Sequence, residues 1–218
     1  MDIRKWFSAD AKVPEHMQEQ EHMQKQEHMQ EEQKQEEQRK EQKKEIKIIK
    51  IYTDGSSLGN GQSYCKYGGI GVYFGDNDNR NISQGILRQG ITNNQCELLA
   101  VLYAIRKVKE TESEISIKQC HLEICTDSKL AVNTFMIWIY GWEKRGWKKK
   151  DNSDIKNLTL IKTIYEELKS LKYEFIHVPA HKKNKFKKHS KEWEKWHGNF
   201  MADYFANSAS TQLQKKSC

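Results

Sequence analysis

Short apolar runs separated by polar breaks mark the folded part of the chain. Residues 45–53 are rich in Ile and β-branched side chains on both faces, which predicts a buried strand. Residues 66–74 and 81–88 predict two further strands, and the turn cluster GDNDN between them favours an antiparallel connection. We therefore expect the domain to begin with three antiparallel strands.

The next segments alternate between helix and strand. The helix predicted over residues 93–109 places Glu97, Val101, Ala104 and Val108 on one stripe, because they are three or four residues apart. The later segments predict strands at 121–126 and 173–178, and helices at 128–140, 154–171 and 197–210. This order predicts an α/β fold in which a five-stranded mixed sheet carries helices on both faces.

A polar segment precedes this domain. Residues 15–45 contain the imperfect six-residue repeat EHMQEQ, EHMQKQ, EHMQEE. Six residues turn a helix by about 240° net, so the repeated methionines point in three directions and form no heptad seam. We expect a disordered spacer or a solvated helix there. The predicted organisation is a terminal peptide at 1–14, the spacer at 15–45, a folded domain at 46–210 and a tail at 211–218.

The charge is unevenly distributed along the chain. The net charge is +7, with about −4 in the spacer and about +10 in residues 46–218. A basic domain favours a polyanion such as nucleic acid as its partner, although a basic domain without such a partner is the alternative. Five cysteines without a C-x-x-C pair favour a reducing, intracellular compartment over secretion. No apolar run approaches the roughly 18 residues of a membrane span, so we expect no membrane partner. We also expect a monomer.

Four carboxylates lie at the margins of apolar segments. Asp54 and Asp127 end predicted strands, Glu97 lies on the apolar helical stripe, and Asp203 borders the Ala-rich stripe of the last helix. Each alone could form a turn or cap a helix. Buried carboxylates are costly unless they are paired or bind a metal, and strand ends that meet helix starts are where α/β sites form. Together these acids suit Mg²⁺ or Mn²⁺, and two such ions about 4 Å apart can clamp a phosphodiester.

Six ordered blocks resemble a known family. They are YTDGSS around Asp54, TNNQCELLA around Glu97, TDSK around Asp127, GWEKRGWKK at 141–149, VPAH at 178–181 and GNFMAD at 198–203. From about residue 46 to residue 210 the chain resembles type 1 ribonuclease H, which cuts the RNA of RNA–DNA hybrids. The resemblance implies a ribonuclease H-like fold and endonucleolytic cleavage that leaves 5′-phosphate and 3′-hydroxyl ends. It also implies two Mg²⁺ ions per site, which Mn²⁺ can replace.

The resemblance assigns a role to each carboxylate. Asp54 would bridge both ions, Glu97 and Asp127 would complete the ion near the leaving group, and Asp203 would complete the ion that activates water. Alternatives are a hybrid-binding module without catalysis, an integrase, transposase or junction resolvase, and a replication adaptor. The four acids argue against the first. The GW-x-x-x-GW-KK segment, together with a Glu in the first long helix, argues against the second.

The resemblance also assigns an assisting histidine. His181, in the VPAH block, would lie on a mobile loop and assist proton transfer or product departure. This chain departs from the family there, because residues 182–196 are longer than the usual loop, and His197 is therefore a rival. Lys182–Lys195 holds seven Lys and two Glu, which fits either an extra phosphate-contacting insertion or a solvated basic loop.

Two groups of residues are candidates for holding the hybrid. Short polar side chains in family positions would touch the minor groove, where RNA 2′-hydroxyls distinguish RNA from DNA; they are Asn60, Thr92, Asn93 and Asn94. Turn and cap chemistry is the alternative for these four. Residues 140–150 interleave five basic residues with two Trp, which suits phosphate neutralisation and stacking on the DNA strand. The residues expected to contact DNA are Trp142, Lys144, Arg145, Trp147, Lys148 and Asn157.

The first seven residues, MDIRKWF, resemble the peptide by which replication proteins bind a sliding DNA clamp. Ile3, Trp6 and Phe7 have its spacing, although the Gln usually found three residues before the aliphatic residue is missing; the alternative is an unbound or self-packing terminus. We expect the cognate clamp to retain the protein in a pull-down, and the Trp6→Ala, Phe7→Ala double variant to lose this retention. Equal retention of the two proteins would exclude a clamp ligand.

Overall fold

The structure is a computed structural model. It describes residues 46–60, 62, 64, 66–180 and 186–217, and positions 23, 25, 26, 28–32 and 34. The chain divides into two compact units, residues 1–45 and 46–218. The described positions of the first unit are helical, and His28 and Glu32 form an ion pair at 3.6 Å. Ile3, Trp6 and Phe7 lie outside the described residues, so the clamp peptide stays a prediction. In the described part of the chain, every helix is too short or too polar to cross a membrane.

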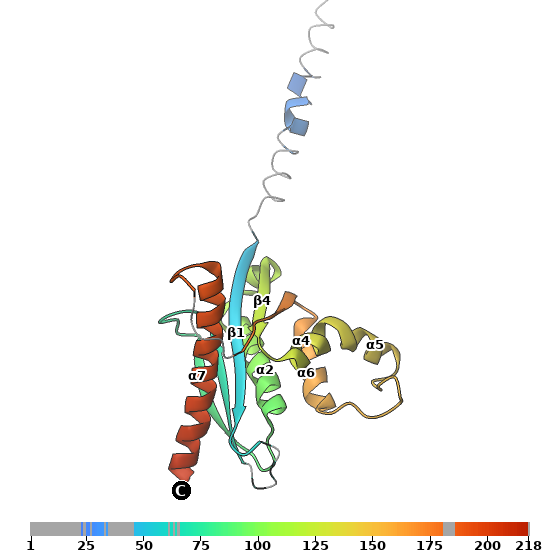
Figure 1. The fold of residues 1–218 in the computed structure, drawn as a ribbon. Helices are drawn as coiled ribbons and strands as arrows, with labels where there is room; N and C mark the ends of the chain where they lie inside the picture. Colours follow the sequence, from blue (N-terminus) through green and yellow to red (C-terminus); the bar gives the residue numbers. More distant parts are fainter. Residues whose placement is uncertain are drawn as a thin grey trace, which may run out of the picture. The chain divides into compact units, whose positions relative to one another are not determined.

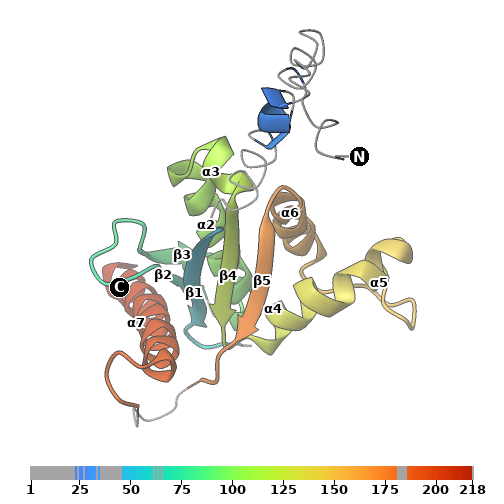
Figure 2. The same cartoon turned by 90° about the horizontal axis from the view of Figure 1, so that it is seen from above.

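Five strands form one mixed sheet beside helix α7 (Figure 1), and Figure 2 shows their order, β3-β2-β1-β4-β5. The strands are β1 (Lys47–Ser57), β2 (Tyr67–Tyr73), β3 (Ile82–Leu87), β4 (Cys120–Thr126) and β5 (Lys172–His177). The pairs β1–β2 and β2–β3 are antiparallel, and the pairs β1–β4 and β4–β5 are parallel. This confirms the predicted five-stranded mixed sheet.

Helices cover both faces of the sheet, with α7 on one face and α2 on the other (Figure 2). The helices are α2 (Asn93–Thr111), α3 (Glu114–Lys118), α4 (Lys129–Asn133), the π-helical turn η2 (Thr134–Trp138), α5 (Ile139–Lys144), α6 (Leu158–Leu168) and α7 (Lys191–Ser217). The main core lies between the sheet and the α2 side, and its fully buried members include Ile51, Leu98, Ile105, Ile124 and Phe135. Burial of each such side chain contributes roughly 1.5–3 kcal/mol, which stabilises the sheet that carries the acids.

Several element boundaries differ from the sequence-based prediction. The helix predicted over 154–171 begins at Leu158 and ends at Leu168, and α7 continues through the predicted tail to Ser217. Strand β1 continues to Ser57, because its ladder with β2 runs on to the pair Ser57–Gly68, so Asp54 lies inside the strand and not at its end. Helix α7 begins at Lys191 and not at His197, because Ser190 Oγ accepts the Trp193 amide and caps the helix. The helix after β4 continues through η2 and α5 to Lys144.

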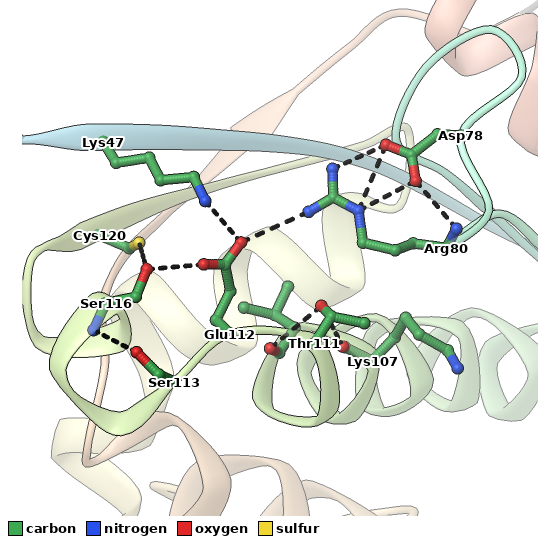
Figure 3. A network of polar contacts seen from close by, with 10 residues as sticks. Lys47, Asp78, Arg80, Lys107, Thr111, Glu112, Ser113, Ser116 and Cys120 are labelled. Carbon is green, nitrogen blue, oxygen red and sulfur yellow. Dashed lines mark hydrogen bonds and ion pairs between the residues drawn. The ribbon is translucent and has the colours of Figure 1, made fainter.

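A polar network ties the start of β1 to the end of α2 and to the β2–β3 turn (Figure 3). Glu112 accepts from Lys47 Nζ at 2.7 Å and from Ser116 Oγ at 2.6 Å, and it lies 3.7 Å from Arg80. Arg80 also pairs with Asp78 at 2.7 Å. These contacts hold the pKa of Glu112 below its usual value, the Lys47 bond contributing most. The network fixes the end of the sheet at which the central strand β1 begins.

Like Gly69, Gly71 on β2 lies where the backbone of α7 packs directly against the sheet. A Cβ atom at this position would lie 2.0 Å from the Ala202 carbonyl oxygen. We expect Gly71→Ala to lower the free energy of unfolding by about 1–3 kcal/mol, because α7 must move outward. Gly75→Ala is the matched control, since nothing lies within 4 Å of the Cβ it would add. Chemical denaturation of both variants measures the difference, and equal stabilities would contradict this packing.

Candidate active site

Strand β1 carries Asp54 at the centre of the sheet. Only 7% of Asp54 is exposed, and it pairs across the ladder with Gly71 of β2. Because Gly71 has no side chain, the backbone of α7 packs directly over the strand pair. The α7 residue closest to Gly71 is Ala202, and Asp203 follows it directly. The glycine at position 71 of β2 therefore lets α7 bring Asp203 next to Asp54.

The residue after Asp54 brings in the second acid from the opposite face. A Cβ at Gly55 would lie 2.1 Å from the Glu97 amide nitrogen, so α2 packs against β1 at this point. Helix α2 begins with a capping box, in which Thr92 Oγ1 accepts from the Gln95 amide and the Gln95 side chain accepts from the Thr92 amide. This fixed helix start places Glu97 in the second turn, beside the strand.

Asp127 joins the site through the register of the parallel strands. Tyr52 of β1 is opposite Cys125 of β4, and Asp54 and Asp127 each lie two residues further along. Ser128, which caps α4, also donates its hydroxyl to the Glu97 carboxylate. The serine that starts one helix therefore joins α2 to the residue next to Asp127.

A second hydrogen-bond chain holds Asp203. Asn207 Nδ2 donates to Asp203 Oδ1 at 2.8 Å, and Ser56 Oγ donates to Asn207 Oδ1 at 2.6 Å. Asn207 is one helical turn after Asp203, and Ser56 is on the same strand as Asp54. Asp203 is thus fixed by a helix neighbour that is itself bonded to the central strand.

The carboxylates are coupled electrostatically. Burial, then the charge of Asp127, and then Asp203 through its charge and a hydrogen bond raise the pKa of Asp54 from 3.8 to about 9, although the Gly55 amide opposes this shift. Burial raises the pKa of Glu97, and Asp127 adds to that rise while the Ser128 hydroxyl opposes it. The largest causes of the Asp54 shift are burial and acidic neighbours. Ionising Asp54 in this place is costly without a cation, so the place fits a divalent cation bound by oxygen ligands.

In the described part of the chain, no group of three His, Cys, Asp or Glu side chains lies ready to hold a metal ion. The four predicted acids are instead linked in pairs, because Asp127 and Asp203 act on Asp54 and Asp127 also acts on Glu97. An all-oxygen donor set of this kind favours Mg²⁺ or Mn²⁺ over softer metals.

The loops predicted to read the minor groove are joined to the site by hydrogen bonds. Asn93 Oδ1 accepts from the Ser57 amide at 2.7 Å, and Asn60 Oδ1 accepts from the Asn93 amide at 3.1 Å. Gln95 Nε2 donates to Asn157 Oδ1 at 3.2 Å. Both the cap interpretation and the groove interpretation of these side chains are therefore compatible with the structure.

A cavity of about 170 Å³ lies beside these loops. Exposed Asn94 lines it together with Asn157 and Trp142. Thr134 also lines it, and its buried hydroxyl has no hydrogen-bond partner among the residues that the structure describes.

The basic protrusion, residues 140–150, separates into a packed side and an open side. Trp147, at φ 66°, packs edge-on against Tyr165 and lies under the Lys162 ammonium. Lys148 pairs with Asp154 at 2.6 Å, whereas Lys144 and Arg145 are exposed. The structure therefore places Trp147 within the support of the protrusion and leaves basic side chains open to solvent.

Sequence reasoning missed Trp138. It is 38% exposed, its ring centroid lies 5.6 Å from that of Trp142, and both line a cavity of about 540 Å³ with Arg145 and Lys149. The signal was the four-residue spacing of the two tryptophans, which puts them on one helix face. The sequence-based prediction ended this helix near Tyr140, so Trp142 was placed outside the helix and the two tryptophans were not expected to share a face.

Of the two candidate histidines, only His197 belongs to the described residues. His181 lies outside them, so its role stays a prediction. His197 Nε2 lies 3.2 Å from Asp76 Oδ1, and its ring stacks on Trp193 at 4.5 Å and meets Tyr73 edge-on. In the described part of the chain, these contacts direct His197 to the turn after β2, and no contact joins it to the four acids.

Comparison with known proteins identifies the family. The RNase H family model matches residues 43–211. Ribonuclease H of Pseudoalteromonas atlantica is 36% identical over 124 residues, which are 56% of this chain and 72% of that protein. The probable ribonuclease H of Acanthamoeba polyphaga mimivirus is 31% identical over 162 residues, 73% of this chain and 66% of that protein. The chain therefore belongs to the ribonuclease H family. It is a nuclease of the hydrolase class, and the enzyme it represents is a ribonuclease H.

Solved structures share the fold. The type 1 ribonuclease H called LC9-RNase H1 aligns with a TM-score of 0.54 at 22% identity, over 77% of this chain and 74% of that one. The RNase H domain of PFV aligns with a TM-score of 0.53 at 20% identity, over 74% of this chain and 93% of that one. These likenesses agree with the sheet order and the helices on both faces.

The raised pKa of Asp54 predicts a pH-dependent stability. In the metal-free protein, folded Asp54 keeps its proton up to about pH 9, whereas the unfolded chain releases it above pH 3.8. The folded state therefore binds more protons between these pH values, and the free energy of unfolding falls as the pH rises from 3.8 toward about 9. We expect Asp54→Asn to be more stable than the parent, by a margin that grows by about 1 kcal/mol or more from about pH 5 to about pH 8. Asp151→Asn is the control, because contacts with Ser153 lower the pKa of that exposed carboxylate. Denaturation in chelator measures the margin, and a margin independent of pH would contradict the coupling.

Proposed function

We propose that this ribonuclease H cuts the RNA strand of RNA–DNA hybrids endonucleolytically by two-metal-ion hydrolysis. The observation that carries the proposal is the buried carboxylate of Asp54, whose pKa is raised by burial and by its acidic neighbours Asp127 and Asp203. Solved relatives support the substrate, since the foamy viral protease-reverse transcriptase, aligned at a TM-score of 0.55, was solved in complex with an RNA/DNA hybrid.

Four side chains would hold the ions. Asp54 would bridge the two positions, Glu97 and Asp127 would complete the position on the leaving-group side, and Asp203 would complete the other. Two Mg²⁺ or Mn²⁺ ions bound there would supply an activated water and charge stabilisation for the scissile phosphate. Hydrogen bonds keep two of these ligands in place before any ion binds, because Ser128 holds Glu97 and Asn207 holds Asp203.

The bond that breaks decides the ends of the products. Water attacks the phosphorus atom while the bond from phosphorus to the 3′ oxygen breaks, so one product keeps a 5′-phosphate and the other gains a 3′-hydroxyl. His181 would assist by moving a proton or by helping the product to leave. The fixed contacts of His197 with Asp76 and Trp193 favour His181 over its rival for this role.

The strands would be held on two sides of the acids. Asn60, Thr92, Asn93 and Asn94 would meet 2′-hydroxyls in the minor groove, where only RNA offers this group. On the DNA side, Trp138 and Trp142 would line a surface that is flanked by basic residues, so stacking and phosphate neutralisation act together. The remaining DNA contacts would come from Lys144, Arg145, Lys148 and Asn157, with Trp147 supporting the protrusion from inside.

A cleavage assay tests the assignment. We expect Mg²⁺-dependent cutting of a hybrid and no cutting of double-stranded RNA, duplex DNA or single strands. Asp54→Asn, Asp127→Asn and Glu97→Gln should lower cleavage by at least about a thousandfold while leaving hybrid binding largely intact, because the ligands of the ions are lost. Glu110→Gln, an exposed acid on the same helix as Glu97, should cut like the parent enzyme. Robust cutting by Asp127→Asn would contradict the two-ion proposal.

A further inference from the structure

Helix α7 carries a row of aromatic side chains at four-residue intervals. The row consists of Trp196, Phe200 and Tyr204, which share one side of the helix because four residues make little more than one turn. Phe200 is 49% exposed and Tyr204 is 56% exposed. The rings of Trp196 and Phe200 are nearly parallel, with centroids 5.4 Å apart and planes inclined by 14°. The row therefore presents the rings of Phe200 and Tyr204 to solvent beside the partly exposed Trp196, and neighbouring exposed aromatic side chains of this kind are more informative than a single exposed apolar residue.

The row runs past the proposed catalytic centre. Asp203 precedes Tyr204 and lies one turn after Phe200, so the row and the acid share a side of the helix. At the other end, Trp196 lines a cavity of about 200 Å³ together with Val178 and Pro179 after β5. From Trp196 to Tyr204 the helix rises by about 12 Å, a length that matches a few nucleotides.

The charge around the start of the row is favourable to a polyanion. Exposed lysines outnumber the two glutamates of the first turn of α7; they are Lys187, Lys188, Lys191 and Lys195. The aromatic side chains on the neighbouring side of the helix make contacts within the protein. Trp193 stacks on His197, and His197 Nε2 lies 3.2 Å from Asp76 Oδ1 in the turn after β2. That inner group has a structural role, whereas Phe200 and Tyr204 are about half exposed, although the Tyr204 ring also meets Phe205 at 6.1 Å.

We propose that the row of Trp196, Phe200 and Tyr204 is a stacking platform for unpaired nucleotides of the RNA strand beyond the hybrid. Bases inside a duplex are already stacked, and only unpaired ones can offer a face to an aromatic ring. The RNA strand is the one that must reach Asp203 to be cut, so it is the strand whose continuation passes the row. This inference rests on the proposed function and extends it to hybrids with RNA overhangs.

Binding to blunt and overhanging hybrids tests the platform in the full-length protein. Chelator removes divalent ions, so that nothing is cut, and fluorescence anisotropy measures affinity for a blunt hybrid and for the same hybrid with an unpaired RNA extension at either end. We expect one RNA extension to tighten binding by about tenfold, since each base stacked on an aromatic ring contributes measurably to affinity. The Phe200→Ala, Tyr204→Ala double variant should lose this preference and bind the blunt hybrid like the parent.

Leu87→Ala is the matched control, because it also removes an exposed apolar side chain, on β3, and it should keep the preference. Equal affinity of the parent protein for blunt and extended hybrids, or an undiminished preference in the double variant, would overturn the platform. An equal gain from a DNA extension would overturn its assignment to the RNA strand. Cleavage of the blunt hybrid in Mg²⁺ is scored separately, so a failure of the proposed function is distinguishable from a failure of the platform.

Discussion

The structure depends on gathering like-charged carboxylates in a buried place. Asp54 is buried beside two acidic neighbours, Asp127 and Asp203, so the neutral form of its carboxyl group is strongly favoured. The apolar core between the sheet and α2 offsets this cost, because it stabilises the strands that carry the acids. Gly55 of β1 and Gly71 of β2 have no side chains, so α2 and α7 can pack directly against the two strands. The acids are therefore held in a repulsive arrangement that a divalent cation would relieve.

Around this centre, the residues that support the site differ from those that face solvent. Ser128 and Asn207 hold two acids by hydrogen bonds, and Trp147 packs inside the protrusion that carries the exposed basic side chains. The polar network of Glu112 lies at the end of the sheet where the central strand β1 begins (Figure 3). Rigid elements thus fix the acids, while loops and the protrusion supply the surfaces proposed to hold the strands.

Most of the fold was predictable, because its signals are local. Runs of β-branched residues marked the strands, and the stripe of Val101, Ala104 and Val108 marked α2, whose members are buried. The errors lie at boundaries. Strand β1 extends past Asp54 because its partner continues the ladder, and α7 starts early because Ser190 caps it. The short helix α3 was missed because its five residues show too little periodicity.

The sequence by itself determined the order of elements, the family resemblance and the four acids, because each depends on the identity and spacing of residues along the chain. The tertiary structure alone decided that Asp54 lies inside a strand, that Gly71 and Gly55 admit the helices bearing Asp203 and Glu97, and that His197 is bonded to Asp76. It also decided that Trp138 is exposed, whereas Trp147 packs against Tyr165. These features depend on contacts between residues far apart in the chain, and local spacing carries no information about them.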